Sequence, residues 1–400
     1  MRKWALPEAI DDVLPSEAAR VEVLRRTMLD CFREHGYRLV QPPLVEYLDS
    51  LLTGSGRDLD LQTFKTVDPM SGRLLGLRAD TTPQVARIDA HLLNESGVSR
   101  LCYAGSVLRT LPAGPGATRE VLQIGAELYG HAGIAADREV LRLLLEALAS
   151  AQLTGLHVDL GHVGIYRALA RSAGLQGDGE GEDSELFTAL RDKDEPSVQE
   201  LTAAYPEPSR TALRQLPELY GPAASTLSSA QALLPALPGI DEALQSIASL
   251  AEAAADRAVL HVDLADLRGY HYYTGATFDV FAADARGTAV ECGRGGRYDG
   301  VGRAFGRARP ATGFTLDLRR VTSLGSDVGA RDPIVAPDDD DPALVAKIRE
   351  LRTAGEAVVV LLPGETVGPR TGRRLAQDGA VWRICASESP RAGIGQDHGP

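Results

Sequence analysis

Near the start of the chain, apolar residues recur at intervals of three or four, which is the spacing of one helical face. We expect this helix to be capped by Ser16, to run to about His35 and to end at Gly36. The following segment, YRLVQPPLVEY, predicts a short strand that two prolines end. The apolar residues of the helix are Val21, Leu24, Met28 and Phe32.

Strand-like and helix-like patterns alternate over the next 120 residues or so. The segment GRLLGLRADTTPQVARIDAHLL predicts a strand pair followed by a helix that opens near Pro83. Residues 99–130 predict two long strands, which the Gly/Pro-rich loop TLPAGPGAT joins. A helix at about 136–151 and the strand-to-helix segment LHVDLGHVGIYRAL complete this part.

Residues 173–255 have a different texture, with helical patches separated by prolines and an acidic loop, GDGEGEDSE. We interpret them as a helical insertion in a core formed by residues 1–172 and 256–328. Residues 329–400 predict a small α/β piece with a loose tail. In that piece we expect two strands, PIVAP and AVVVLL, a helix capped by Asp341, and a hairpin that turns at Asp378-Gly379.

Composition limits the classes of function. The net charge of −13 and the lack of a Lys/Arg block do not favour a nucleic-acid partner. No apolar run approaches the ~20 residues of a membrane span, and the N-terminus has no apolar signal core. We therefore expect a cytoplasmic protein that binds neither tRNA nor membrane.

The four cysteines are scattered, without a CxxC pair or a histidine at metal-ligand spacing. We accordingly expect four reduced thiols and no metal site. The cysteines are Cys31, Cys102, Cys292 and Cys385.

The stretch LRGYHYYTGATFDVF, residues 267–281, concentrates hydrogen-bonding side chains on what we predict to be one hairpin. Its Arg, His and Tyr residues are typical of the wall of a small-molecule pocket. On the second of the two long strands predicted for residues 99–130, Gln123 and Glu127 lie four residues apart and therefore point to the same side.

Four ordered segments over about residues 5–325 resemble the histidyl branch of the class II aminoacyl-tRNA synthetases. The resemblance implies an α+β fold: an antiparallel class II sheet with flanking helices, a helical insertion and a small C-terminal α/β piece. The three class II motifs match GYRLVQPPLVE, YAGSVLRTLPAGPGATREVLQIGAELYG and GRGGRYDGVGRAFGRARPATGFTLDLRR, and the histidine-specific segment of that branch matches RGYHYYTG.

The resemblance also implies a site for free L-histidine. In that family an acidic residue and a Thr hold the α-amino group, a Gln and a Glu hold the amino group and the imidazole, and Arg and Tyr residues complete the pocket. Carboxylates suit an ammonium or a ring N–H, and Arg suits a carboxylate. The matching positions are Asp80, Thr82, Arg109, Gln123, Glu127, Arg268, Tyr272, Tyr273 and Tyr298.

The nucleotide half of the family's site matches less well. Arg109 and Arg320 occupy the positions of the two phosphate-binding arginines, and with Arg119 they are candidates for residual anion binding. An added carboxylate ~4 Å from a phosphate costs on the order of 1 to 4 kcal/mol, so Asp317 disfavours a nucleotide. The family's other contact positions are here Leu111, Ala117 and Arg319.

These departures and the short C-terminal piece resemble the regulatory subunits of ATP phosphoribosyltransferase, a non-catalytic branch of the same superfamily. That resemblance implies no catalytic residues, no cofactor and L-histidine as ligand. It also implies a homodimer, paired through residues 37–47, within a hetero-oligomer with the short-form catalytic subunit. The subunit would activate that enzyme and mediate its feedback inhibition by histidine, an allosteric role in histidine biosynthesis.

Two other classes of function remain open. The chain could be a histidine-adenylating enzyme similar to a truncated histidyl-tRNA synthetase, which the retained arginines support. It could instead be an RNA-binding regulator, which the acidic charge does not favour. His271, which replaces an acidic residue of the synthetases, could be a pH-sensitive contact or an ordinary partly buried imidazole.

Overall fold

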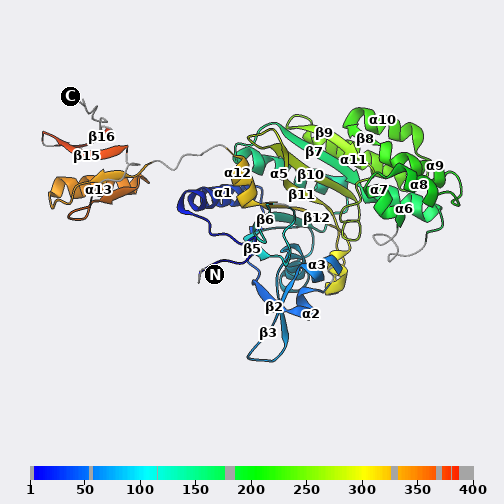
Figure 1. Cartoon of the computed structure of the whole chain (residues 1–400), viewed down its shortest axis with the longest axis horizontal. Coiled ribbons are helices and arrows are strands. Elements are labelled where there is room, and N and C mark those ends of the chain that lie inside the picture. Colours follow the sequence, from blue (N-terminus) through cyan, green and yellow to red (C-terminus); the bar gives the residue numbers. More distant parts are fainter. Residues whose placement is uncertain are drawn as a thin grey trace, which may run out of the picture. The chain divides into compact units, whose positions relative to one another are not determined.

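The computed structural model describes residues 4–53, 57–114, 116–175, 185–325, 332–365, 372–379 and 381–386. The chain divides into two compact units, Met1–Ser326 and Asp327–Pro400. Each unit has its own hydrophobic core. Figure 1 shows the helices and strands of both units.

Within the described residues, the first unit contains a nine-stranded mixed sheet. The six central strands are each antiparallel to their neighbours in space, in the order β5-β6-β12-β11-β10-β7. A parallel pair lies on either side of them, β1 with β5 and β7 with β9. This arrangement confirms the predicted α+β class with an antiparallel centre. In spatial order the strands are β1 (Arg38–Leu39), β5 (Ser99–Leu108), β6 (Glu120–Tyr129), β12 (Ala311–Asp317), β11 (Ala289–Arg297), β10 (Ala276–Ala283), β7 (Leu156–His162), β9 (Ala258–Asp263) and β8 (Tyr220–Pro222).

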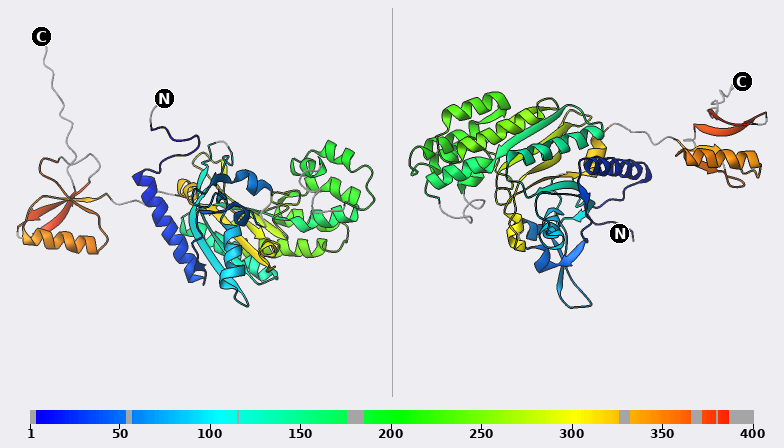
Figure 2. Two further views of the ribbon diagram at one scale, coloured as in Figure 1. Left: turned by 90° about the horizontal axis from the view of Figure 1, so that it is seen from below. Right: turned by 180° about the vertical axis from the view of Figure 1, so that it is seen from behind.

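Helices flank this sheet (Figure 2). The first helix begins at Pro15 with Leu14 as its N-cap, so the prediction of a Ser16 cap is wrong. Proline suits a first helical position because its missing N–H has no partner there anyway. The helices of the first unit are α1 (Pro15–Glu34), α2 (Leu48–Leu51), α3 (Arg57–Gln62), α4 (Thr82–Arg87), η1 (Ile88–Leu93), α5 (Ile134–Ser150), α6 (Val163–Ser172), α7 (Glu185–Arg191), α8 (Glu195–Leu201), α9 (Ser209–Gln215), η2 (Leu216–Glu218), α10 (Ala223–Leu233), α11 (Ile240–Ala254), η3 (Val301–Phe305) and α12 (Leu318–Leu324).

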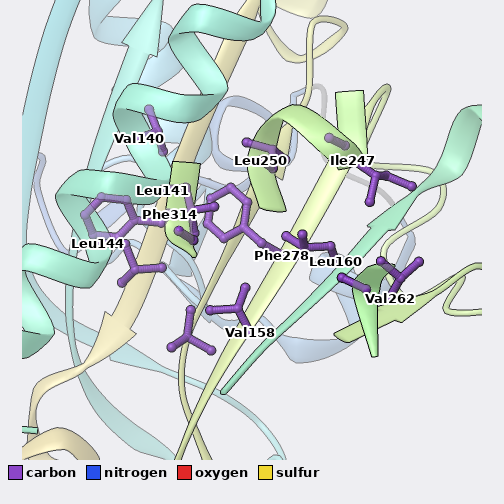
Figure 3. Close-up of a cluster of buried hydrophobic side chains, with 14 of the residues drawn as sticks. Val140, Leu141, Leu144, Val158, Leu160, Ile247, Leu250, Val262, Phe278 and Phe314 are labelled. Carbon is purple, nitrogen blue, oxygen red and sulfur yellow. The ribbon is translucent and has the colours of Figure 1, made fainter. Parts of the chain in front are cut away.

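One face of the sheet is apolar and carries the main core. Alternate residues of the strands point to this face, among them Phe314 of β12 and Phe278 of β10, and they pack against α5 and α11 (Figure 3). Burial of these side chains is the main stabilising contribution of the unit. Those labelled in Figure 3 are Val140, Leu141, Leu144, Val158, Leu160, Ile247, Leu250, Val262, Phe278 and Phe314.

The opposite face of the same strands is rich in polar residues and glycines. Because side chains alternate along a strand, Gln123, Gly125 and Glu127 of β6 point away from the apolar core. The register places Thr315 opposite Gly125, and Arg294 of β11 opposite both Thr315 and Asp279 of β10. A row of polar side chains therefore crosses the middle of the sheet.

A separate small sheet projects from this core as an arm (Figure 1). It consists, in the order β2-β4-β3, of β2 (Val45–Tyr47), β4 (Leu74–Leu77) and β3 (Phe64–Val67). The segment in which we predicted a strand pair before Pro83 contains one strand, β4, whose partners β3 and β2 precede it in the sequence, so the predicted pair is wrong. The helix predicted near Pro83 is α4, which begins at Thr82. Apolar side chains are exposed along the arm and the segment before it, including Leu39, Leu44, Val45, Tyr47 and Met70.

The segment 173–255, which we separated as an insertion, forms α7 to α11 and the short edge strand β8. Its buried residues, such as Leu190 and Leu213, belong to the same core as the sheet and α5. The acidic loop at residues 176–184 lies outside the described residues. Our boundaries for the insertion therefore stay a prediction.

The second unit is a small α/β structure. Its described residues form a four-stranded sheet of order β14-β13-β15-β16, and α13 packs on one face through Leu344, Ile348 and Leu351. Asp341 accepts a hydrogen bond from the Ala343 N–H at 2.9 Å, which confirms the predicted cap. The elements are β13 (Ile334–Ala336), α13 (Pro342–Thr353), β14 (Val358–Val360), β15 (Arg373–Asp378) and β16 (Val381–Ala386), and the last two form the predicted hairpin.

Candidate ligand-binding site

Five side chains meet on the polar face of the sheet, and we call them the polar cluster: Asp80, Thr82, Gln123, Glu127 and Tyr298. The Gln123 amide links two parts of the chain, because its Nε2 donates to Asp80 Oδ1 at 2.8 Å and its Oε1 accepts from the Thr81 N–H at 2.9 Å. The Thr82 N–H lies 3.4 Å from the same Asp80 oxygen. These contacts hold the loop before α4 against β6.

Glu127 is the most deeply placed acid of the polar cluster, with 1% of its surface exposed. Its Oε2 accepts a hydrogen bond from the Tyr298 hydroxyl. Gly313 of β12 lies directly below the carboxylate, where any side chain would collide with it. Burial raises the pKa of Glu127 to about 8, although the Tyr298 hydrogen bond acts in the opposite direction. Near neutral pH the Glu127 side chain therefore favours its protonated form.

An aromatic wall closes one side of the polar cluster. The ring of Tyr272 stacks on that of Tyr298, with centroids 5.0 Å apart, and Tyr273 meets Tyr272 edge to face at 5.3 Å. Tyr272 Oη and Thr81 Oγ1 are buried and have no hydrogen-bond partner among the described residues. Buried hydroxyl groups normally find a partner, so these two atoms indicate room for a polar ligand.

The tyrosines come from a turn rather than a strand. Residues 267–275, which we predicted to lie on a hairpin, form a compact loop between β9 and β10, and only the part from Ala276 onward is a strand. Gly269 has a φ of +69°, and its carbonyl accepts from the N–H groups of Tyr272 and Tyr273. This left-handed conformation favours glycine and turns both rings toward the sheet.

Two buried arginines hold the cluster in place, and sequence reasoning did not single them out. Arg297, the neighbour of Tyr298, donates to Asp137 of α5 at 2.8 Å and to Asp299 at 3.1 Å. Arg78 donates to the Pro42 and Ser106 carbonyls, both at 2.8 Å. Apart from Asp299, these acceptors come from distant parts of the sequence, so no local pattern reveals the contacts to Asp137, Pro42 and Ser106.

Tyr103 of β5 was also missed. It is buried, and its hydroxyl lies 3.4 Å from Thr82 Oγ1. It lies opposite Gly125 in the sheet and thus on the same face as Gln123 and Glu127. The alternation of the strand YAGSVL, combined with the pairing of the two long strands, is a signal that could have found it.

Beside the polar cluster, five charged residues pair with one another, and we call them the paired network: Asp266, Arg268, Asp279, Glu291 and Arg294. Arg268 binds the carboxylates of Asp266, at 2.9 and 3.1 Å from Nε, and of Asp279, at 2.8 Å. Arg294 donates to Glu291 at 2.8 Å. Burial raises the pKa of Asp279 to about 6 against the opposing effect of Arg268.

Arg268 is thus the predicted site residue that the structure does not bring to the polar cluster. We expected its guanidinium to receive the carboxylate of a ligand, but in the structure two acidic side chains take that place. Asp266 precedes it by two residues and Asp279 lies across the loop on β10. Arg109, also assigned to histidine binding, contacts the Ala79 carbonyl. The remaining assigned residues lie together, and all of these assignments stay predictions: Asp80, Thr82, Gln123, Glu127, Tyr272, Tyr273 and Tyr298.

The three arginines predicted to retain anion binding make contacts with main-chain carbonyls. Arg109 Nε lies 3.4 Å from the Ala79 carbonyl, next to Asp80. Arg119 donates to Arg109 O at 3.2 Å, and its guanidinium lies over the ring of Phe64. Arg320 donates to the Glu291 carbonyl at 3.3 Å. In the described part of the chain, none of these three side chains contacts a carboxylate within 4 Å.

The residues that replace the family's nucleotide contacts have local roles. Asp317 is the N-cap of α12 and accepts from the N–H groups of Arg319 and Arg320 at 3.0 and 3.4 Å. The Arg319 side chain binds Glu17 of α1 at 3.1 Å. Leu111 is 71% exposed in the loop between β5 and β6. The ring of His271 contacts that of Tyr270 rather than the polar cluster.

Chemically, the arrangement offers carboxylate and amide acceptors, hydroxyls and aromatic surface within one enclosed region. Such a set suits a small ligand with an ammonium group and an aromatic N–H. None of the helices in the described residues has the length and apolar character needed to cross a bilayer.

Sequence profiles of known families match nearly the whole chain. The histidyl-tRNA synthetase family matches residues 9–321, and the C-terminal domain of the ATP phosphoribosyltransferase subunit HisZ matches residues 331–385. The regulatory subunit of ATP phosphoribosyltransferase from Cupriavidus necator is 56% identical over 95% of this chain and 98% of its own length. The protein of the same description from Ralstonia nicotianae is 53% identical over 96% and 98%.

Solved structures show the same fold. A Bacillus halodurans protein described as an ATP phosphoribosyltransferase regulatory subunit/histidyl-tRNA synthetase matches with a TM-score of 0.77 and 28% identity, over 91% of this chain and 94% of that one. Histidyl-tRNA synthetase from Nostoc sp. PCC 7120 matches with a TM-score of 0.69 over 94% and 92%. At 16% identity, the second likeness concerns the fold alone.

Proposed function

Because the chain belongs to the family of ATP phosphoribosyltransferase regulatory subunits, with a histidyl-tRNA synthetase-like core, we propose that it is a non-catalytic sensor of L-histidine. It binds histidine in the polar cluster, activates the short-form catalytic subunit and mediates its feedback inhibition. It acts in the cytoplasm and requires no cofactor for this role.

The observation that carries the histidine proposal is the composition of the polar cluster. Asp80 and Gln123 offer two acceptors to the α-ammonium group, and Glu127 with Tyr298 offers a buried partner to the imidazole. The hydroxyl of Tyr272, which has no hydrogen-bond partner among the residues that the structure describes, adds a further hydrogen-bonding group. Sites built from buried hydrogen-bonding groups reject analogues that lack the matching groups, often by ~10⁴-fold.

The nucleotide half of the site supports a non-catalytic role. Adenylate formation depends on arginines that are free to stabilise phosphate charge. Here Arg268 is bound by two carboxylates, and the carboxylate of Asp317 lies at the start of α12. A nucleotide would have to displace or approach these acidic groups. We therefore infer that the acidic groups beside Arg268 and at the start of α12 disfavour nucleotide binding.

Assembly through the arm completes the proposal. The segment 37–47 exposes Leu39, Leu44, Val45 and Tyr47, and such a row of apolar side chains favours burial against another chain. We propose a homodimer paired through this segment, within a hetero-oligomer with the catalytic subunit. In the free protein, backbone amides of residues 37–47 should be protected from hydrogen exchange; exchange typical of an exposed loop would contradict the dimer.

The test of the proposed function is the turnover of the short-form catalytic ATP phosphoribosyltransferase of the same organism, measured with and without this protein. We expect the protein to raise the rate, histidine to reverse the rise, and Glu127→Ala to make the rate insensitive to histidine. An unchanged rate, with the two proteins shown to be folded and histidine still bound, would reject the regulatory role.

Histidine adenylation is the second candidate, since Arg109 and Arg320 contact only main-chain carbonyls in the described residues and are available to an anion. Histidine-dependent exchange of pyrophosphate into ATP separates the two functions. We expect no exchange above background from this protein, whereas a synthetase-like enzyme would catalyse it.

A further inference from the structure

Away from the polar cluster, three side chains with metal-binding atoms meet where α1 and α5 pack against each other. Cys31 and His35 lie at the end of α1, and Glu146 lies near the end of α5. The thiol sulfur, a ring nitrogen and a carboxylate oxygen all lie within 4.8 Å of one another. Across the described ranges, no other three His, Cys, Asp or Glu side chains come together in this way.

The spacing of the first two residues suits a shared ligand. Residues four apart on a helix lie on the same face, one turn above the other, as in metal sites built on a single helix. Glu146 then approaches from the neighbouring helix. The side chains of His35 and Glu146 are 38% and 44% exposed, so an ion can enter from solvent, and Cys31 is partly buried beneath them.

The orientation of His35 provides independent support for a cation. Its Nδ1 lies 2.9 Å from the Cys31 carbonyl and donates to it when it carries the proton. Nε2 then presents a lone pair to Glu146 Oε2, 3.6 Å away. Two acceptors at this separation repel each other unless a proton or a metal ion lies between them. Metal-bound histidines commonly donate their other N–H to a carbonyl in this manner.

We propose that Cys31, His35 and Glu146 bind a divalent transition-metal cation, with Zn²⁺ as the best match to this set of ligands. Thiolate and imidazole ligands suit zinc, whereas Mg²⁺ and Ca²⁺ prefer sites made of oxygen atoms alone. Water completes the tetrahedral coordination. Binding releases the thiol proton to solvent and involves no redox change.

The surroundings of the proposed site affect how strongly it binds a cation and which elements the cation joins. Arg257 Nη1 lies 3.5 Å from Glu146 Oε2 and competes with the cation for that carboxylate. The bound cation joins the end of α1 to α5, directly before Tyr37 and the segment that we assign to the dimer. None of the three residues contacts the polar cluster in the described part of the chain.

This inference departs from our sequence-based expectation of no metal site. We searched for paired cysteines and overlooked the Cys31-His35 spacing, which supplies two ligands. The third ligand, Glu146, comes from a distant part of the sequence and is joined to them only by the packing of α1 on α5.

The test uses the full chain, reduced and freed of metal with a chelator. ZnCl₂ is titrated by calorimetry, and CoCl₂ by absorption spectroscopy, in which thiolate coordination gives a charge-transfer band in the near ultraviolet. We expect one cation per chain. Cys31→Ser should remove the band, and His35→Ala and Glu146→Gln should each weaken Zn²⁺ binding ~10-fold or more. Arg257→Met should strengthen it, because a competitor for Glu146 is gone.

Cys385→Ser is the matched control, because it removes another partly exposed thiol, in the second unit, and should leave the titrations unchanged. A measurement on the unmodified chain covers variants that fail to fold: Zn²⁺ should slow alkylation of Cys31 but not of Cys385, as followed by peptide mass spectrometry. The proposal is overturned if neither cation binds, if the cobalt band survives in Cys31→Ser, or if Zn²⁺ leaves the alkylation of Cys31 unchanged.

Discussion

The polar cluster and the paired network lie side by side on one face of the sheet, yet their charged groups have different partners. In the polar cluster, Glu127 contacts the Tyr298 hydroxyl, and buried hydroxyls such as Tyr272 Oη have no partner in the described residues. In the paired network, Arg268 and Arg294 are each bound by acidic side chains of the same chain.

The polar cluster therefore has groups that can still bind a ligand, whereas the arginines of the paired network are already bound to carboxylates of the same chain. A buried acid without a cationic partner is costly to ionise, so a ligand that brings positive charge gains from contact with Glu127. An arginine already held by two carboxylates gains much less from a further anion, which must compete with them. The two neighbouring regions are therefore expected to respond in opposite ways to substitution.

The largest expected effect is the loss of histidine binding in Glu127→Ala. The substitution removes a buried charged acceptor, which costs about 3 kcal/mol or more and hence ~100-fold or more in affinity. Calorimetry measures the change. Glu120→Ala, at the exposed start of the same strand β6, is the matched control and should bind as the parent does. Equal loss in both variants would mean that Glu127 acts through folding.

The next effect is a dependence of histidine affinity on pH. Burial raises the pKa of Glu127 to about 8 in the protein without histidine, so at lower pH this acid must lose a proton before its carboxylate can accept the N–H of the neutral imidazole. Affinity should therefore rise by up to ~10-fold per pH unit as the pH approaches 8 from below, and then level off. Titrations between pH 6.5 and 8.5 check this. Glu127→Gln, which cannot ionise, should flatten the dependence, and a parental curve that is already flat would contradict it.

The same group should affect stability with a defined sign. The unfolded carboxyl, with a pKa near 4.5, is ionised at pH 7, whereas the folded one holds its proton. The stability that this proton contributes is present at low pH and is lost as the pH rises through about 8. Denaturant unfolding without histidine should show this decline, and Glu127→Gln should lack it.

A smaller effect, about 1 kcal/mol, is expected at the start of α12. Asp317→Ala removes the cap and should lower the free energy of unfolding by that amount, whereas Asp317→Asn keeps a capping oxygen. Denaturant titration compares the two. If both variants instead bind ATP more tightly and unfold like the parent, Asp317 acts mainly through its charge on a nucleotide site rather than as the cap of α12.

The smallest effect concerns the paired network. Asp279→Asn removes one of the two acidic partners of Arg268 and should increase pyrophosphate affinity a few-fold, by at most about 1 kcal/mol. Ser106→Ala, on β5 and remote from Arg268, serves as a control. Unchanged or reduced pyrophosphate binding in Asp279→Asn would show that the acidic side chains of the network do not limit access of anions.

The parts of the site that sequence could predict depend on local spacing. The four-residue separation of Gln123 and Glu127 correctly put them on one face of a strand, and the Pro342 helix with its Asp341 cap was also correct. The strand pair 99–130 followed from two long apolar runs around a Gly/Pro-rich loop. In each case the determining residues are neighbours in sequence.

What sequence missed depends on partners that only the fold brings together. Arg297 meets Asp137 of α5, and Glu146 meets His35, across elements far apart in the chain. Arg268 is a different case, because its partner Asp266 lies only two residues before it. We predicted that Arg268 binds the carboxylate of a ligand and did not consider Asp266 as its partner. The Asp317 cap of α12 is likewise a local feature, but we considered only the effect of its charge on a nucleotide.

Whether the protein binds histidine but no nucleotide is measured by a calorimetric titration of the isolated protein, first with L-histidine and then with Mg²⁺·ATP. We predict one histidine bound per chain, no binding in Glu127→Ala, and no heat from ATP with or without histidine. Saturable ATP binding, enhanced by histidine, would contradict the non-catalytic role, because it would show that the nucleotide half of the site is still open.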